Sequence, residues 1–385
     1  MYRAQTNSAR HDSPARASMA PSVRKPERAL IAFPDAAAAE TLIAGLPAAA
    51  RVVREAAQAG LRECWLDAGP DWSPSSRLRI EVQRLAGAMR VHWPDGDPPP
   101  AAKESVLLVR GETLPTAWSI AGATTRLQSV VITDAGRRAE LRHDDAAKIR
   151  RHYARAGRAI LAATAKPTDG IVSRHLNRPM SQAISGALLR IPGFRPFHAT
   201  AGTAVLAALM FAALTLYGAS GLLAGALLFQ AASMFDGVDG EAARSTFRSS
   251  DVGAMFDSLI DALTNLLFVL GVVVNMFAAG HAQAAGYGAC GLLLLATGLT
   301  IIGRRARASA GPFTFDGVKD RMRARGTRLG QWLIWLTMRD FLAFAAVVLV
   351  LLGWVEPALL AFSIVMAGWL VVVVATGLRH SAAAR

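Results

Sequence analysis

Hydrophobic and polar positions divide the 385-residue chain into two unlike halves. In the first half, short apolar runs alternate with stretches of helical periodicity, a pattern that predicts strands alternating with helices. Such alternation predicts a soluble α/β domain with a mainly parallel sheet. The apolar runs occupy residues 29–33, 63–66, 89–93, 106–109 and 129–133, and the helical stretches include 48–59 and 77–86.

Six long apolar segments follow, and several approach the roughly 20 residues that cross a bilayer as a helix. They predict an α-helical polytopic membrane domain of six transmembrane helices. The segments occupy residues 199–217, 221–235, 254–277, 286–302, 340–354 and 357–378. Just before them, apolar residues lie among arginines, which predicts an amphipathic helix on the membrane surface. These apolar residues are Ile184, Leu188, Leu189 and Ile191.

The pattern therefore predicts four regions. Residues 1–28 lack an apolar core and form a disordered basic arm, and residues 29–165 form the soluble α/β domain. Residues 166–198 form a junction with the amphipathic helix, and residues 199–385 form the six-helix domain. Abundant glycine and alanine in the apolar segments permits close helix packing, and we expect a homodimer.

The chain has a formal net charge of +14. The position of its Lys and Arg residues along the chain is informative about membrane topology. The loops at 218–220, 278–285 and 355–356 carry no Lys or Arg, whereas the loop at 303–329 is strongly basic. The positive-inside rule then predicts that both termini and the soluble domain lie on the cytoplasmic side, as in a bacterial-type inner membrane. Arginines beside apolar segments favour anionic substrates and lipid headgroups over nucleic acid as partners. Cys64 and Cys290 have no metal-ligand spacing, so we expect neither a disulfide nor a zinc site.

Four carboxylates lie at the ends of two neighbouring apolar segments. Asp236 and Asp239 are three residues apart, and Gly253, Asp257 and Asp261 follow at intervals of four, so each set shares one helix face. Any one of them alone is explained equally well as a solvated residue that caps a helix. Four unpaired carboxylates in a bilayer would cost on the order of 10 kcal/mol. We therefore expect a cation between the two faces.

These acids belong to the pattern Asp-x2-Asp-Gly-x2-Ala-Arg-x8-Gly-x3-Asp-x3-Asp. The pattern closely resembles the signature of the CDP-alcohol phosphotransferase (CDP-alcohol phosphatidyltransferase) family. The resemblance implies that Asp236, Asp239 and Asp257 are metal ligands and that Asp261 is the general base. It also implies a CDP site lined by Gly240, Ala243, Arg244 and Gly253. Asp251 lies outside the pattern and is interpreted as a loop or N-cap residue.

The chemistry of such a reaction requires these residue types. A hydroxyl that displaces CMP attacks a phosphorus crowded by anionic oxygens, so the charge has to be neutralised first. Carboxylates without nearby His or Cys suit hard cations, and we expect two Mg²⁺ or Mn²⁺ ions. A phosphorylated acceptor also needs cations, and Arg304, Arg305 and Arg339 lie at helix ends level with the acids.

Residues 43–69 read IAGLPAAARVVREAAQAGLRECWLDAG. This stretch resembles the early part of a sugar-phosphate nucleotidyltransferase, here in a degenerate form. The order Asp169-Gly170, Ser173-Arg174, Asn177-Arg178 and Ser181 resembles the junction in bifunctional inositol-1-phosphate cytidylyltransferase/CDP-inositol phosphotransferase enzymes. Active nucleotidyltransferases carry a glycine-rich basic loop after the first strand, but residues 34–41 contain no Gly, Lys or Arg. We therefore predict that this domain has lost nucleotidyl transfer. By this resemblance Glu112 could occupy the place of that family's metal-binding acid, but a solvated turn is the simpler interpretation.

Three functions remain in competition. The first is a membrane phosphotransferase that uses a CDP-alcohol, either a soluble CDP-polyol such as CDP-inositol or CDP-diacylglycerol, and forms a polyol phosphate or a phospholipid. The second is an ion-coupled transporter, which needs a site near mid-membrane, often between repeated halves. We find no internal repeat, and the acids lie near one membrane face. The third, a nonenzymatic scaffold, does not explain an intact acid set.

Overall fold

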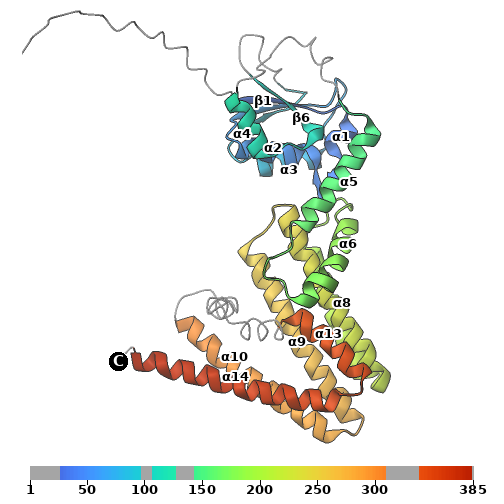
Figure 1. Cartoon of the computed structure of the whole chain (residues 1–385), viewed down its shortest axis with the longest axis vertical. Coiled ribbons are helices and arrows are strands. Elements are labelled where there is room, and N and C mark those ends of the chain that lie inside the picture. Colours follow the sequence, from blue (N-terminus) through green and yellow to red (C-terminus); the bar gives the residue numbers. More distant parts are fainter. Residues whose placement is uncertain (1–26, 97–105, 127–142, 309–337, 384–385) are drawn as a thin grey trace, which may run out of the picture. The chain divides into compact units, whose positions relative to one another are not determined.

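The structure is a computed structural model that describes residues 27–96, 106–126, 143–308 and 338–383 (Figure 1). Contacts divide the chain into two units, each described separately below. The first unit comprises Met1–Glu40 and Ala48–Asp145, and the second comprises Thr41–Pro47 and Ala146–Arg385. Of the predicted arm, residues 1–26 lie outside the described residues, and Arg28 already begins the first strand.

The first unit contains a parallel sheet of four strands in the order β5-β4-β1-β6. The strands are β1 (Arg28–Ala32), β4 (Glu63–Asp67), β5 (Arg90–His92) and β6 (Leu107–Arg110). Each coincides with a predicted apolar run, which confirms the α/β prediction. The strand predicted at 129–133 lies outside the described residues.

Helices complete the first unit. They are α1 (Ala36–Glu40), α2 (Ala48–Gln58), α3 (Ser76–Ala86) and α4 (Ala117–Arg126), with a 3₁₀ turn η1 (Gly111–Thr113). Helices α2 and α3 contact each other and lie on the same side of the sheet in Figure 1. Ile31, Val53 and Leu78 are fully buried, so the core combines β1 with both helices.

The second unit begins with α5 (Ala146–Ala162), η3 (Ser173–Asn177, a π-helical turn) and α6 (Arg178–Leu188). A short hairpin of β2 (Leu42–Ile43) and β3 (Leu46–Pro47) groups with them. Gly45 in its turn has φ +90°, and a Cβ there would come within 2.8 Å of Leu189 and Thr246 side chains. Glycine therefore meets both demands of this position. Because α5 groups with the helical unit, this division differs from the predicted boundary at residue 165, which stays a prediction.

Among the described residues that follow, a helix coincides with each of the six predicted apolar segments. These helices are α7 (Pro196–Leu216), α8 (Gly218–Ser245), α9 (Asp251–Ala278), α10 (Ala282–Ala308), α13 (Arg339–Leu351) and α14 (Val355–Ala383). Within the described residues, only α7 to α10 contain segments long and apolar enough to cross a membrane, and the apolar part of α14 is shorter. An integral membrane domain is thus supported with four spans, whereas the predicted number of six is not established.

The helices pack around a shared apolar core. Met210 and Leu214 of α7 meet Phe229 of α8 and Val272 of α9, and the Phe229 ring stacks on Phe268 with ring centroids 4.2 Å apart. At one end of this core, the Asn275 side-chain amide donates to the carbonyl oxygens of Leu214 and Gly218 at 2.6 and 2.7 Å. The first bond satisfies a carbonyl group in the last turn of α7, and the second ties α9 to the first residue of α8.

Candidate active site

The turn from α8 to α9 brings the four acids together. Only residues 246–250 separate the two helices, which contact each other. The side chain of Ser250 accepts from the Gly253 N–H at 3.1 Å and caps α9, whereas Asp251 is an exposed residue of the first turn. The interpretation of Asp251 as a loop or N-cap residue was therefore wrong, since the better-placed hydroxyl of Ser250 takes the cap.

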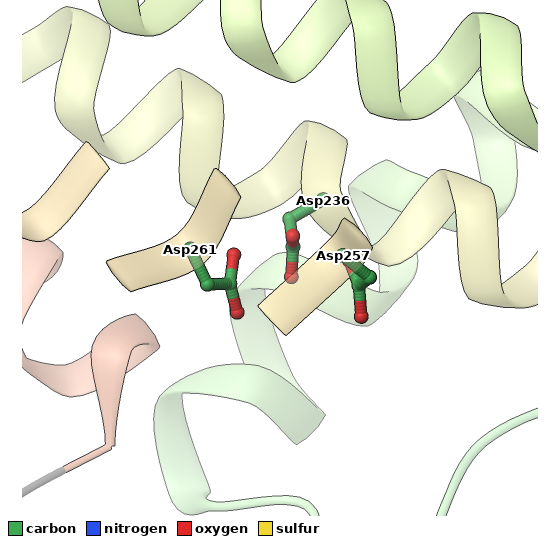
Figure 2. Close-up of side chains that lie close together, drawn as sticks. All are labelled: Asp236, Asp257 and Asp261. Atoms are coloured by element: carbon green, nitrogen blue, oxygen red, sulfur yellow. The ribbon is translucent and has the colours of Figure 1, made fainter. Parts of the chain in front are cut away.

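Three carboxylates form the centre of the site. Oxygen atoms of Asp236, Asp257 and Asp261 all lie within 4.8 Å of one another. Figure 2 shows Asp236 from α8 between Asp257 and Asp261 from α9 in this view. Carboxylates from the two acid-bearing helix faces thus lie close together.

The fourth acid, Asp239, adjoins this group on its buried side. Its side chain accepts from the Thr200 hydroxyl of α7 at 2.9 Å and lies within hydrogen-bond distance of Asp257. Thr200 therefore orients the carboxylate from a third helix. Two carboxylates in such contact repel each other unless a proton or a cation lies between them.

Arg339, the first residue of α13, brings a cation to the acids. Its Nη1 lies 3.0 Å from Oδ1 of Asp236 and also contacts Oδ1 of Asp261. Its Nε and Nη2 are buried without a hydrogen-bond partner among the described residues. The sequence-based expectation of a cation between the acid faces is thus met by the chain's own arginine.

The donor set also fits a divalent metal ion. Carboxylate oxygens within 4.8 Å of one another can share one ion, because hard cations bind oxygen at about 2.0–2.6 Å. A cationic guanidinium already bonded to two of these acids shows that the position favours positive charge. The three grouped acids include Asp261, which was predicted as the base rather than as a ligand.

The small residues of the motif leave space for the side chain of Arg244. A Cβ on Gly240 would lie 2.9 Å from Nη1 of Arg244, so the guanidinium covers this glycine one turn away. The Arg244 Nε donates to the Thr164 carbonyl oxygen at 3.0 Å, and Ala243 is half-buried beside it. Gly253 is exposed at the start of α9. Gly240 thus makes room for Arg244, and binding of a nucleotide by these residues remains a prediction.

The other predicted acceptor residues are less well defined. Arg304 is exposed on α10, and among the residues that the structure describes no hydrogen bond or ion pair joins it to the acids. Arg305 belongs to the same helix, but its side chain lies outside the described residues. Of the two predicted acceptor arginines whose side chains the structure describes, Arg339 contacts the acids and Arg304 does not.

One group of polar residues was missed from the sequence. Glu241, inside the motif, is fully buried, and its carboxylate accepts from Ser181 and Ser185 of α6. Ser181 and Arg178 were noted only as part of the junction. The available signal was the spacing of Ser181 and Ser185, which places both hydroxyls on one face of α6.

In the first unit, the loss of nucleotidyl transfer stays a prediction. After β1 the Asp35 side chain accepts from the Ala38 N–H at 2.7 Å, so a side-chain oxygen occupies the start of α1 where a phosphate would need free amides. The interpretation of Glu112 was wrong, because it is 2% exposed. It accepts from Arg110 at 2.9 Å and pairs with His143 at 3.0 Å, which offsets its burial.

Comparison with known proteins agrees with this geometry. Residues 198–369 match the family model described as CDP-alcohol phosphatidyltransferase, and this segment contains all four acids. This part of the chain is thus similar to the CDP-alcohol phosphatidyltransferase family. The sequence resemblance is therefore confirmed, and the family supports a transferase.

The chain is also similar to three curated proteins, each named bifunctional IPC transferase and DIPP synthase. The relative from Aquifex aeolicus is 38% identical over 108 residues, which are 28% of this chain and 24% of the relative. The relative from Rubrobacter xylanophilus is 35% identical over 173 residues, 44% of this chain and 35% of the relative. The relative from Archaeoglobus fulgidus is 38% identical over 116 residues, 30% of this chain and 22% of the relative. The matches thus span about a quarter to a third of these relatives' length.

Proposed function

We propose that the chain transfers a substituted phosphate group from a CDP-alcohol to a hydroxyl acceptor and releases CMP. The observation that carries this proposal is the convergence of Asp236, Asp257 and Asp261 within the matched segment. Carboxylates on two adjacent helices supply hard oxygen ligands at one point, which is what an anionic phosphoryl centre requires.

The residues take the following roles in this proposal. Asp236, Asp239 and Asp257 hold Mg²⁺ or Mn²⁺, two ions in all, which neutralise the diphosphate oxygens when bound. Asp261 accepts the proton of the acceptor hydroxyl as its oxygen bonds to phosphorus. The bond from that phosphorus to the oxygen of CMP breaks, and CMP leaves with the electron pair. Gly240, Ala243, Arg244 and Gly253 line the nucleotide site.

The substrate is proposed to be a CDP-polyol such as CDP-inositol, with a phosphorylated polyol such as inositol phosphate as the acceptor. Two observations support this choice. Relatives carry names that contain DIPP synthase, and Arg339 brings a buried guanidinium to the acids, where it can bind an acceptor phosphate. Arg304 and Arg305 are proposed to assist it. The enzyme acts as a homodimer in a bacterial-type inner membrane, with its site and termini on the cytoplasmic side.

The test is CMP release by the purified full chain. CDP-inositol and CDP-diacylglycerol are supplied separately, each with inositol phosphate or a lipid-linked alcohol, in Mg²⁺ and in EDTA. We expect Mg²⁺-dependent CMP release with CDP-inositol and inositol phosphate. Release only from CDP-diacylglycerol would make the chain a phospholipid synthase instead. Absence of release from both donors would refute the phosphotransfer proposal.

A further inference from the structure

Helix α8 carries a second polar face, turned away from the acid cluster. Ser233, Gly237 and Glu241 follow at intervals of four residues and lie on one side of the helix. At 3.6 residues per turn, the middle of this side is about 130° around the helix from Asp236 and Asp239. The end of α8 is therefore polar on two sides, only one of which faces α9.

Glu241 is the most enclosed group on this second face. Its side chain has no exposed surface, and it accepts from the Ser181 and Ser185 hydroxyls at 2.6 Å each. The Arg178 guanidinium donates to the same carboxylate at 3.1 Å. Burial of a charge is costly unless several donors compensate it, and here three donors from α6 do so.

Further contacts continue along the same face. Asn177 of η3 donates to the Ser233 hydroxyl at 3.1 Å and accepts from the Gln230 side-chain amide at 2.8 Å. Between these contacts and Glu241, Gly237 allows α6 to approach closely, since a Cβ there would lie 3.0 Å from the Ser181 side chain. We call this set of contacts the polar seam. It comprises Asn177, Arg178, Ser181 and Ser185 with Gln230, Ser233, Gly237 and Glu241.

An ion pair anchors the seam to the preceding loop. Arg178 donates to both carboxylate oxygens of Asp169, at 2.8 and 3.1 Å. Burial alone would lower the pKa of Arg178, but its bonds to Asp169 and Glu241 outweigh burial and raise that pKa. Burial likewise acts to raise the pKa of Asp169, yet the bonds from Arg178 prevail and lower it. Both groups are therefore held in their charged forms, and η3 and α6 form a fixed support for α8.

We propose that Glu241 is a positioning residue for the acid cluster, which acts by fixing the rotation of α8 through the polar seam. A side-chain carboxylate lies about 5–6 Å from the helix axis, so a rotation of about 20° would move Asp236 or Asp239 by about 2 Å. That displacement is comparable to a metal–oxygen bond length. The turnover measurements for this inference rest on the proposed function. The metal-binding measurements do not, because they are made without substrate.

The experiment compares full-length variants in detergent micelles. Glu241→Gln replaces one acceptor oxygen by an amide donor, and Ser181→Ala with Ser185→Ala removes two donors while keeping the Arg178 ion pair. The matched control is Asn275→Ala, which removes a buried polar side chain from α9 about 27 Å of helix away from Asp257. Mn²⁺ affinity is measured by electron paramagnetic resonance without substrate, and helix content and thermal unfolding are measured in parallel.

We expect both seam variants to bind Mn²⁺ about tenfold to a hundredfold more weakly, the range for residues that orient metal ligands. Asn275→Ala should lower the unfolding temperature but keep the wild-type Mn²⁺ affinity. In turnover, kcat should fall in the seam variants while the acceptor KM changes little.

Two results would overturn the inference: wild-type Mn²⁺ affinity in a folded Glu241→Gln protein, or an equal loss of Mn²⁺ affinity in Asn275→Ala. If Glu241→Gln does not fold, the double serine variant decides the question by the same criterion. A wild-type protein that binds Mn²⁺ without releasing CMP would instead refute the proposed function alone.

Discussion

Replacement of Arg339 by glutamine should strengthen the binding of the metal ion and weaken the binding of the acceptor. The guanidinium bonds to Asp236 at 3.0 Å and also contacts Asp261, so a metal ion that binds these acids competes with it. One unit charge pair at 3 Å is worth about 5–6 kcal/mol at an effective dielectric constant of 20. Because the two aspartate side chains are 26% and 32% exposed, solvent screens much of this, and about 1.5–3 kcal/mol remains for each charged hydrogen bond.

Loss of even one such bond predicts a metal affinity at least about tenfold higher in Arg339→Gln, since 1.4 kcal/mol corresponds to a factor of ten. Mg²⁺ titration calorimetry on the substrate-free protein measures this directly. The acceptor KM should rise in the same variant, because the proposed phosphate ligand is gone. Arg304→Gln is the matched control for metal affinity alone, since Arg304 is exposed on α10 and no described contact joins it to the acids. Unchanged or weaker Mg²⁺ binding in Arg339→Gln would refute the competition argument.

The remaining predictions concern the acids and the first unit. Asp257→Asn should abolish CMP release without unfolding the protein, whereas Asp251→Asn should be nearly silent; near-normal release by the Asp257 variant in excess Mg²⁺ would contradict the ligand assignment. Asp261→Asn should lower the chemical step by about 10² to 10⁴-fold and keep donor affinity by calorimetry. Loss of donor and metal binding there would make Asp261 a fourth ligand. The full chain should release no pyrophosphate from CTP and inositol-1-phosphate, because Asp35 already satisfies an amide at the start of α1. Metal-dependent pyrophosphate release would contradict that prediction.

The acid cluster could be predicted from the sequence because its information is local. Asp257 and Asp261 share a helix face by spacing alone, and so do Asp236 and Asp239. The cost of unpaired carboxylates in an apolar segment then requires a cation nearby. The strands of the first unit could also be predicted from the sequence, because each is a short apolar run between helical stretches.

The polar seam could not be predicted, because its partners are distant in the sequence. The spacing of Ser181 and Ser185 indicates a polar face on α6, but it does not show that this face meets Glu241, which lies 60 and 56 residues away. The apolar residues after the junction suggested a helix whose buried side is apolar. In the structure, the side of α6 that meets α8 carries two serines instead. Leu189 is buried against Leu161 and Ala242, whereas Ile191 is exposed. The pairing of Arg339 with two acids was missed for the same reason, since 78 residues separate it from Asp261.

The length of α8 explains how one helix serves both the membrane and the acid cluster. Its 28 residues extend about 42 Å, whereas a bilayer core is about 30 Å thick. If the apolar start of the helix occupies the core, the excess of about 12 Å corresponds to the last eight residues, from Val238 to Ser245. Asp236 and Asp239 then lie at the boundary between lipid and water, where charged substrates from either phase can reach them. A transporter needs its acids near mid-membrane, and a carboxylate at the boundary cannot meet that requirement.

The polar seam lies at the same level of α8 as the acids. Polar side chains on two sides of a helix are tolerated only where the helix leaves the lipid or where another helix, here α6, covers them.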